Sequence, residues 1–421
     1  MKFLFSHRNF PAQFRHIITE LGKDPKNEVV FLTGTRNLVA IQGVTKLLYK
    51  TKRRVPENSH RYLKMYEDSI IHGQAAAEAA IRLKSNGFIP DIIYAHSWGN
   101  SMFFKDIFPD TPLINYCEWY YNAQGADIGF DRIMPNYDKK ALTRCNNSQF
   151  LQDLISCDKA ICPTQWQKSQ FPKDLQNKIE VLHDGIDTDY FIPNPDAEFI
   201  LPDTGMVLTS KDEVLTYASR GMEAYRGFPQ FMDAAEALLK KRPKLHIVIA
   251  GEDRVCYGPK LANGTYKSAM LKSHNYDISR LHFTGGLPYK EYRKLLQISS
   301  AHCYLTYPFI LSWSMLEAMS TECLIIASKT KPVEEVIKDR KNGFLVNFYD
   351  VEELVKTAED ALDNREKYKK IRQNARRTII EKYDLKKLLP KQIQLLKSYS
   401  KKEDENNTSN EKVINLNSIR H

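Results

Sequence analysis

The chain has 421 residues and a formal net charge of +10 at pH 7; 42% of its residues are hydrophobic and 27% are charged. This length exceeds one ordinary hydrophobic core and predicts two domains, and the composition is typical of a globular protein. No apolar run approaches the roughly 20 residues that span a bilayer, which argues against a membrane-spanning protein.

The first residues, MKFLF, are too short for the apolar core of a secretion signal, and no small-residue cleavage site follows. Seven cysteines are scattered without a C-x-x-C pair, so the sequence indicates neither a zinc site nor a disulfide framework. We therefore expect reduced thiols and a cytoplasmic protein.

The positive charge favours an anionic partner, such as a nucleotide or a phospholipid surface. Peripheral contact with the inner face of a membrane stays open on this ground. The densest basic stretch, Lys50–Arg54, has no interleaved aromatic residues, so no nucleic-acid partner is expected.

In chain order, the first half alternates short apolar runs with segments of helical period. Strands are predicted at KFLFS, EVVFLTG, VTKLLYK, PDIIYAHS, PLINYC and DKAICPT. A long Ala-rich helix between the third and fourth of these runs closes at Gly87. Strands that alternate with helices predict a parallel, doubly wound sheet. The Pro- and Asp-rich stretch Phe191–Asp203 is then typical of a linker.

The same rhythm restarts at EVLTYASR, so the fold class predicted is α/β, with two Rossmann-like parallel-sheet domains that face a cleft. The domains expected are a first Rossmann-like domain over 1–195 and a second over 196–385. A helix over 386–400 is expected to pack back on the first domain. The last stretch, 401–421, lacks an apolar period and is predicted to be disordered.

Parallel sheets bind ligands beyond the carboxyl ends of their strands, so residues that directly follow strands are the candidates. Arg220 and Arg226 follow one strand. Two guanidinium groups on such a loop offer paired N–H donors that can bind the oxygens of a diphosphate. The alternative that they only pair with surface carboxylates stays open. Glu252 and Gly286 follow the next strands and are expected in the floor of a nucleotide pocket.

The segment TYPFILSWSMLEAMSTECLIIAS passes from a strand into a helix expected to begin near Ser312. The N–H groups at that helix start attract an anion, and Ser312 and Ser314 are candidate ligands for phosphate or sugar hydroxyls. Glu317, about a turn and a half further on, is placed to accept hydrogen bonds from a sugar diol. The alternative is that Glu317 caps its own helix or pairs with a lysine.

Candidates from the first half follow its first, fourth and fifth strands: His7, Arg8, Asn9, Gln13, His96 and Glu118. His96 lies where an imidazole bonds a hydroxyl or acts on a proton, although a lone histidine is often structural. Glu118–Asp131, rich in aromatic and turn-forming residues, is interpreted as an acceptor-recognition loop.

The runs HDGIDTDYF, ASRGMEAYRGF, VIAGED, LHFTGGLPYKEYRKLLQISSAHCYL, LEAM and NGFLV follow one another in an order that resembles glycosyltransferase family 4, of GT-B fold. The likeness is specific over Ser156–Asp363 and loose in the first half. It implies retaining transfer of a sugar from a nucleoside-diphosphate sugar, without a metal or other cofactor.

By position, the resemblance implies that Arg220 and Arg226 neutralise the donor diphosphate, that Glu317 binds the ribose and that His96 contacts the transferred sugar. These arginines and His96 are the expected catalytic residues. The family more often has lysine at the place of Arg226. The earlier acid of its two-glutamate motif falls at Phe309, which leaves donor-sugar recognition open.

The first loop lacks the family's glycine, so Arg8, Asn9 and Gln13 would meet the phosphates through side chains. The D-x-D spelled by Asp187–Asp189 resembles a metal motif of another fold, but it offers too few oxygens, and no metal is expected. The function predicted is a hexosyltransferase acting on a glycan, a lipid-linked sugar or a protein. A sugar-nucleotide epimerase and a non-catalytic sugar-nucleotide-binding protein are the alternatives.

Overall fold

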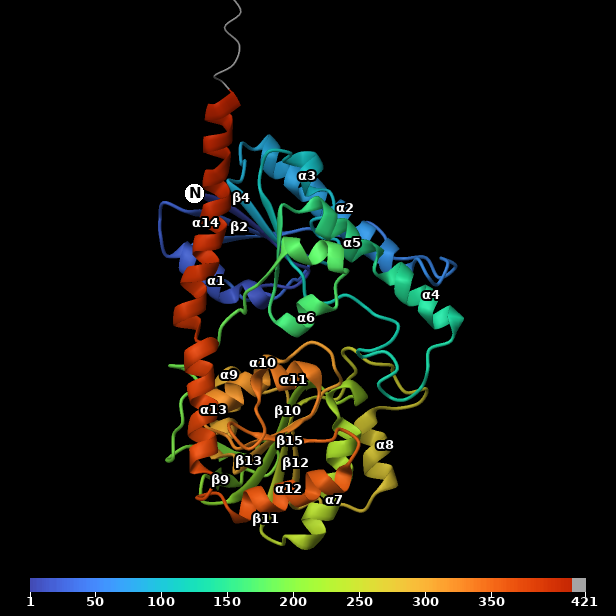
Figure 1. Ribbon diagram of the computed structural model, residues 1–421, viewed down its shortest axis with the longest axis vertical. Coiled ribbons are helices and arrows are strands. Elements are labelled where there is room, and N and C mark those ends of the chain that lie inside the picture. Colours follow the sequence, from blue (N-terminus) through green and yellow to red (C-terminus); the bar gives the residue numbers. More distant parts are fainter. Residues whose placement is uncertain (411–421) are drawn as a thin grey trace, which may run out of the picture. The chain divides into compact units, whose positions relative to one another are not determined.

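The computed structural model describes residues 1–410, and side chains up to residue 400. The chain forms two compact units (Figure 1). The first unit comprises residues 1–123, 135–184 and those from Lys387 on; the second comprises 124–134 and 185–386. Each is described by itself.

The first unit contains a seven-stranded parallel sheet in the order β3-β2-β1-β4-β5-β6-β7. Its strands are β1 (Lys2–Ser6), β2 (Glu28–Thr33), β3 (Val44–Leu48), β4 (Ile92–His96), β5 (Leu113–Tyr116), β6 (Lys159–Cys162) and β7 (Ile179–Val181). Its helices are η1 (Ala12–Phe14), α1 (Arg15–Gly22), α2 (Lys64–Ser85), α3 (Phe104–Ile107), α4 (Tyr137–Asn146), α5 (Ser148–Ser156), α6 (Gln165–Ser169), η2 (Lys173–Lys178) and most of α14 (Leu385–Asn410).

Both faces of this sheet are buried, which explains why its strands read as continuous apolar runs. In β1, Leu4 packs into a core with the alanines of α2, whereas Phe3 and Phe5 pack into the opposite core with α1. Leu388 and Leu396 of α14 belong to that second core. The amphipathic face of α14 thus completes the first unit.

The second unit contains a six-stranded parallel sheet in the order β12-β11-β10-β13-β14-β15. Its strands are β10 (Glu213–Gly221), β11 (Leu245–Glu252), β12 (Leu281–Gly285), β13 (Ala301–Tyr304), β14 (Ile325–Ser328) and β15 (Phe344–Val346). Its helices are η3 (Ala224–Arg226), α7 (Phe228–Lys241), α8 (Tyr266–Ser273), α9 (Tyr289–Ile298), α10 (Trp313–Ser320), α11 (Lys331–Val336), α12 (Val351–Asp363) and α13 (Lys369–Lys382).

The strand order of each sheet reverses once, and this reversal sets where polar loops meet. In the first sheet β1 and β4 lie side by side, and in the second β10 and β13 do. Their following helices leave in different directions, which opens a crevice at the carboxyl ends of such a pair. The loops after β1 and β4, and those after β10 and β13, are therefore brought together within their own units.

Two predictions about chain segments need correction. The stretch predicted as a linker, Phe191–Asp203, contains β8 (Glu198–Ile200), which pairs antiparallel with β9 (Val207–Thr209), and the units divide at Asp184 and Gly185 instead. Phe199 and Leu208 of this hairpin are buried against α9, which is why the stretch is ordered. Disorder was also predicted from residue 401, but α14 continues to Asn410. Residues 411–421 lie outside the described residues.

Residues 124–134 come from the first half of the sequence but belong to the second unit. The Tyr225 hydroxyl donates to Asp127 Oδ2 at 2.9 Å, and the Tyr349 hydroxyl donates to the Phe130 carbonyl at 3.1 Å. The Phe130 ring lies 4.9 Å from that of Tyr307. These contacts make the segment an integral part of the second unit.

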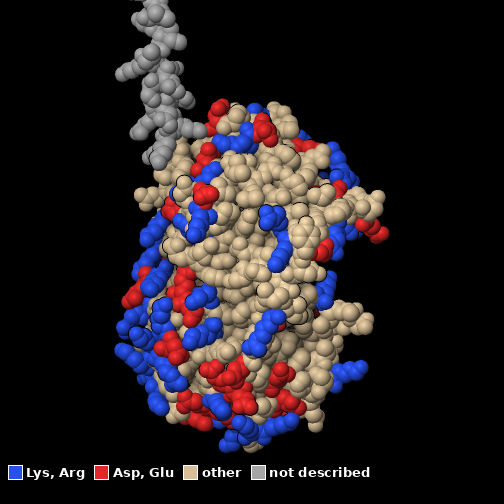
Figure 2. Space-filling view, turned by 45° about the vertical axis from the view of Figure 1, so that its right-hand side comes forward, with Lys and Arg blue, Asp and Glu red and all other residues tan. Residues whose placement is uncertain are grey.

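Charged side chains are unevenly spread over the face in Figure 2. Lys and Arg gather along its left edge with acidic residues between them, and a broad area in the middle carries few charges. The net positive charge therefore does not form one unbroken patch on this face. In the described part of the chain, no helix has both the length and the apolar character required to cross a bilayer.

Candidate functional site

Two arginines follow β10. Arg220 is the penultimate residue of that strand and is exposed, whereas Arg226 ends η3 and is 6% exposed. The turn after η3 depends on Gly227, which has φ +64° and where a Cβ would lie 2.4 Å from the Cβ of Leu305. Both arginine side chains line one hollow of the second unit.

The guanidinium of Arg226 has uncharged partners. Its Nη1 donates to Thr306 Oγ1 at 2.9 Å, to the Ile310 carbonyl at 3.0 Å and to the Tyr304 hydroxyl at 3.3 Å. The ring of Tyr257 lies over it at 5.1 Å. Among the described residues, no carboxylate reaches it within 4 Å. A buried cation is stabilised by an anion in direct contact, so this hollow favours an anionic ligand.

The start of α10 faces the same hollow. Ser312 is its N-cap, and the Ser312 Oγ accepts from the Ser314 backbone N–H at 3.3 Å. Ser312 and Ser314 both line the hollow beside the two arginines. Because β13 lies next to β10, the positive end of this helix adds to the guanidinium charges. The helix begins where the sequence predicts it.

Glu317 lies in α10 and is 4% exposed. The Tyr289 hydroxyl, from the first residue of α9, donates to its Oε1. Burial raises the pKa of this carboxyl to about 7, although the bond from Tyr289 opposes the shift. No lysine or arginine of the described residues lies within 4 Å of it, and the N-cap position belongs to Ser312. The structure thus contains neither of the two alternatives considered for Glu317.

A cavity of about 450 Å³ brings the candidate donor-binding residues of the second unit together, within the size range of small-molecule sites. Its lining includes Arg220, Glu252, Gly286, Ser312, Ser314 and Glu317. The hollow around Arg226 shares Arg220, Ser312 and Ser314 with this cavity. The seven donor-side candidates therefore occupy one continuous region.

Glu252 and Gly286 lie next to each other in this cavity. A Cβ on Gly286 would lie 3.7 Å from Glu252 Cγ, and Glu252 forms an ion pair with Arg254 at 2.5 Å. Both side chains of this pair are about half exposed, at 55% and 50%. Glu252 and Arg254 can therefore exchange their ion pair for hydrogen bonds to a polar ligand.

Phe309 occupies the place of the earlier acid of the family motif. It is 3% exposed, and its ring lies 5.4 Å from those of Tyr225 and Tyr257. A carboxylate in this aromatic cluster would lose its hydration by burial. The substitution is therefore accompanied by local packing that suits an apolar ring.

Four of the first-unit candidates form a cluster at the carboxyl ends of their strands. His96 ends β4 and is 3% exposed; its Nε2 lies 3.4 Å from Glu118 Oε2, and its ring lies 4.3 Å from that of His7. Gln13 Nε2 donates to Glu118 Oε1 at 2.5 Å. His96 is also stacked on Tyr116 at 5.5 Å. The imidazole thus has a carboxylate neighbour.

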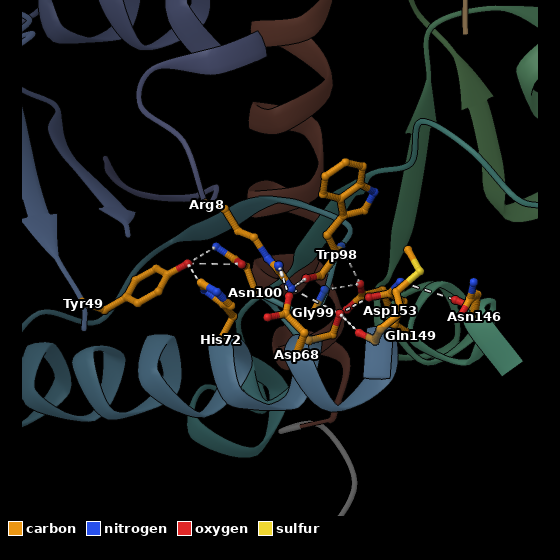
Figure 3. Close-up of polar contacts among 12 residues, drawn as sticks. Arg8, Tyr49, Asp68, His72, Trp98, Gly99, Asn100, Asn146, Gln149 and Asp153 are labelled. Carbon is orange, nitrogen blue, oxygen red and sulfur yellow. Dashed lines mark hydrogen bonds and ion pairs between the residues drawn. The ribbon is translucent and has the colours of Figure 1, made fainter. Parts of the chain in front are cut away.

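The side chains of Arg8 and Asn9 lie outside this cluster, although the backbone N–H of Asn9 donates to His7 Nδ1 at 2.7 Å. Arg8 Nη1 forms an ion pair with Asp68 at 2.5 Å, and its Nη2 donates to the Trp98 carbonyl at 2.9 Å (Figure 3). Asn9 Oδ1 accepts from Thr35 Oγ1 at 3.1 Å. Both side chains have partners within the first unit, so phosphate contact would require them to exchange these bonds.

The turn directly after His96 is held by Asp153 from α5 (Figure 3). Trp98 has φ +141°, a strained value for a residue with a side chain. The Asp153 carboxylate, 1% exposed, accepts the backbone N–H groups of Trp98 and Gly99 at 3.1 Å each. Burial raises its pKa to about 6. Asp153 thus fixes the backbone that carries His96.

Sequence reasoning missed Asp153, Tyr257 and Tyr289. Asp153 and Tyr257 lie outside every motif considered, and their roles arise from contacts with loops far away in the sequence. Tyr289 stands within the run LHFTGGLPYKEY, where an aromatic residue just after a strand was a usable signal.

A second cavity of the second unit, of about 390 Å³, involves the predicted acceptor-recognition loop. Residues between Gly125 and Phe130 form one wall, and Pro308 and the stretch from Lys329 to Glu334 form the other. Glu118 of the same predicted loop belongs to the first unit. The loop is thus divided between the two units. In the described part of the chain, no group of three His, Cys, Asp or Glu side chains is placed to hold a metal ion.

The fold is GT-B, as the similarity to solved structures shows. Sucrose-phosphate synthase from Thermosynechococcus elongatus matches with a TM-score of 0.71 at 11% identity, over 94% of this chain and 98% of that one. HepE of Anabaena in complex with UDP-glucose matches with a TM-score of 0.64 at 14% identity, over 94% of this chain and 100% of that one. A glycosyltransferase from Rickettsia africae matches with a TM-score of 0.65 at 15% identity, over 94% of this chain and 98% of that one.

Residues 25–191 match the glycosyl transferase family 4 group, and residues 207–378 match the glycosyl transferases group 1. The chain therefore belongs to the family 4-type glycosyltransferases, as the resemblance of its motifs predicts. No curated protein matches the sequence.

Proposed function

We propose that this glycosyltransferase is a retaining enzyme that moves a sugar, of hexose type, from a nucleoside-diphosphate sugar to an acceptor hydroxyl. The observation that carries the proposal is the guanidinium of Arg226, buried among uncharged partners in a hollow that it shares with Arg220 and the start of α10. A diphosphate supplies negative charge in direct contact with this guanidinium. The structure of HepE, which holds UDP-glucose, supports this class of donor.

Each donor-side residue has a role in this proposal. Arg220 and Arg226 bind the diphosphate, with Arg226 contributing a fork of N–H donors in place of the family's lysine. The start of α10 binds a phosphate oxygen. Glu317 exchanges its bond from Tyr289 for bonds from the ribose hydroxyls. Glu252 and Gly286 lie in the floor of the base pocket.

The chemical step follows from this charge distribution. The bond between the anomeric carbon and the diphosphate oxygen breaks, and its electron pair stays on that oxygen. The acceptor oxygen forms its bond on the same face, and its proton passes to an oxygen of the departing phosphate. Fixed positive groups that stabilise the departing diphosphate give the main rate acceleration. We propose that two arginines and a helix start supply this stabilisation without a metal ion.

The acceptor is proposed to be a glycan, a lipid-linked sugar or a protein, and the loop that lines the second cavity is proposed to bind it. The scattered cysteines, with no C-x-x-C pair in the sequence, support a cytoplasmic location. Peripheral membrane contact would bring the enzyme to a lipid-linked acceptor.

The test begins with thermal melting of the full chain in the presence of UDP-, GDP- and ADP-linked hexoses, because a bound ligand stabilises the fold in proportion to its occupancy. We expect one of these donors to raise the melting temperature, also with a chelator present. The product formed with an acceptor panel is expected to keep the anomeric configuration of the donor. Stabilisation by none of the three donor classes would contradict the proposal.

A non-catalytic sugar-nucleotide-binding protein is a second candidate, and the buried Phe309 in place of an acid favours it. Under this alternative a donor binds, but no acceptor is glycosylated and no donor is hydrolysed. Assays of wild type with a bound donor and the acceptor panel separate the two, because any glycosylated acceptor excludes the non-catalytic protein. If wild type is active, Phe309→Glu should reduce its turnover, because the carboxylate would be buried among aromatic rings.

His96→Ala is expected to lower kcat roughly tenfold or more while the donor dissociation constant changes less than about threefold, since it removes one hydrogen bond to the sugar in the transition state. Steady-state kinetics and donor titration measure the two quantities. His60→Ala, an exposed histidine elsewhere in the first unit, is the matched control. Equal losses in kcat and donor affinity would remove His96 from the reacting centre.

A further inference from the structure

Glu223 is a fully buried carboxylate in the loop between Arg220 and Arg226. It is 0% exposed. Its side chain accepts three consecutive backbone N–H groups of another loop: those of Cys256 at 3.2 Å, Tyr257 at 2.9 Å and Gly258 at 2.7 Å. Its carbonyl accepts the N–H groups of Arg226 and Phe228, both at 3.2 Å. One residue thus joins the arginine loop to the loop after β11.

Two glycines show how closely these loops approach. A Cβ on Gly221 would lie 2.5 Å from the Arg254 carbonyl oxygen and 2.9 Å from the Cys256 sulfur. A Cβ on Gly258 would lie 2.8 Å from the ring of Tyr225 and 3.4 Å from Glu223 Oε2. Backbone lies against backbone here, so the loop after β11 has little room to shift while the three N–H bonds are in place.

The side chain fixed by this arrangement is Tyr257. Its backbone N–H bonds Glu223, and its ring lies 5.1 Å from the Arg226 guanidinium and 5.4 Å from the Phe309 ring. Stacking on an aromatic face restricts the rotation of a guanidinium and holds its donors in one plane. The three bonds to Glu223 therefore determine how Arg226 is presented in the hollow.

We propose that Glu223 is a positioning residue for the diphosphate: it touches no ligand, but it places Tyr257 over Arg226 and so orients the guanidinium toward the phosphates. This inference rests on the proposed function, because it names the residue that shapes the same anion site. It predicts a selective effect, in which recognition of the phosphates weakens while recognition of the nucleoside does not.

The experiment is isothermal titration of the full chain with UDP, GDP and ADP, and with the corresponding nucleosides. For the nucleotide that binds wild type, Glu223→Gln is expected to weaken the diphosphate roughly tenfold, the loss typical of one hydrogen bond to a charged group. The affinity for the nucleoside should change less than about twofold. Glu381→Gln, which removes an exposed carboxylate from α13, is the matched control and should change neither.

A second pair of variants keeps the test decisive if Glu223→Gln fails to fold. Tyr257→Leu removes the aromatic face and should reproduce the selective loss, whereas Tyr257→Phe keeps the ring and should bind as wild type does. An equal loss of diphosphate and nucleoside affinity in Tyr257→Leu, or an unchanged diphosphate affinity in folded Glu223→Gln, would overturn the inference. If wild type binds none of the three nucleotides, the proposed function fails and the inference falls with it.

Discussion

Arg226→Ala is expected to reduce kcat/KM for glycosyl transfer roughly 100- to 1,000-fold, the range seen when one fixed donor to a developing negative charge is removed. The effect is large because the guanidinium is buried, so water cannot replace its donors beside the phosphates. Its three hydrogen-bond partners, Tyr304, Thr306 and the Ile310 carbonyl, also hold it in place before a ligand arrives. Little rearrangement is then needed on binding.

Steady-state kinetics of three variants measures this contribution. Arg226→Lys keeps the charge but loses the fork of donors, so its activity should lie between those of wild type and Arg226→Ala. Arg377→Ala, on the exposed side of α13, is the control and should retain wild-type activity. If Arg226→Ala retained more than about a tenth of wild-type kcat/KM, Arg226 would not stabilise the leaving group.

Glu317→Gln is expected to stabilise the protein at pH 8 and to leave its stability nearly unchanged at pH 5. Burial raises the folded-state pKa of this carboxyl to about 7, whereas an unfolded glutamate has its ordinary lower pKa. The folded state therefore holds the proton more tightly, and wild type loses stability as the pH rises from the unfolded pKa through 7. The whole difference between the folded and unfolded pKa of Glu317 corresponds to a loss of roughly 3 kcal/mol in the free energy of unfolding of wild type.

Urea denaturation at the two pH values checks this expectation, with Glu381→Gln as an exposed control that should show no such pH dependence. The same Glu317→Gln variant should bind the nucleotide more weakly, because an amide is a poorer acceptor for ribose hydroxyls than a carboxylate. A gain in stability would thus accompany a loss of affinity. An identical stability difference at pH 5 and pH 8 would show that Glu317 titrates as an exposed carboxyl does.

The strands and the start of α10 were predictable from the sequence because their signals are local. Continuous apolar runs indicated the parallel strands, and Ser312 at the junction of a strand and a helical period indicated an N-cap. The placement of Arg220 and Arg226 after a strand also followed from local pattern. The contacts of these arginines could not be predicted from local pattern, because the partners of Arg226 come from the end of β13 and the loop after it.

The features that escaped prediction depend on pairings between distant segments. The bond from Tyr289 to Glu317 joins α9 to α10, and Asp153 supports the turn after His96 from α5. The hairpin of β8 and β9 lies within a stretch whose prolines and aspartates are equally typical of a linker. No residue type or sequence spacing indicates such contacts, because they form only when distant segments pack together in the folded chain.

The assignment of residues 124–134 to the second unit has a practical consequence for dissecting the protein. The chain passes between the units at 123/124, 134/135, 184/185 and 386/387, so no single cut separates them. A recombinant fragment that starts at Gly185 would leave the rings of Tyr307 and Phe348 without Phe130, and the Tyr225 hydroxyl without Asp127. Independent expression of the second unit would thus require this short peptide to be grafted back or supplied in trans.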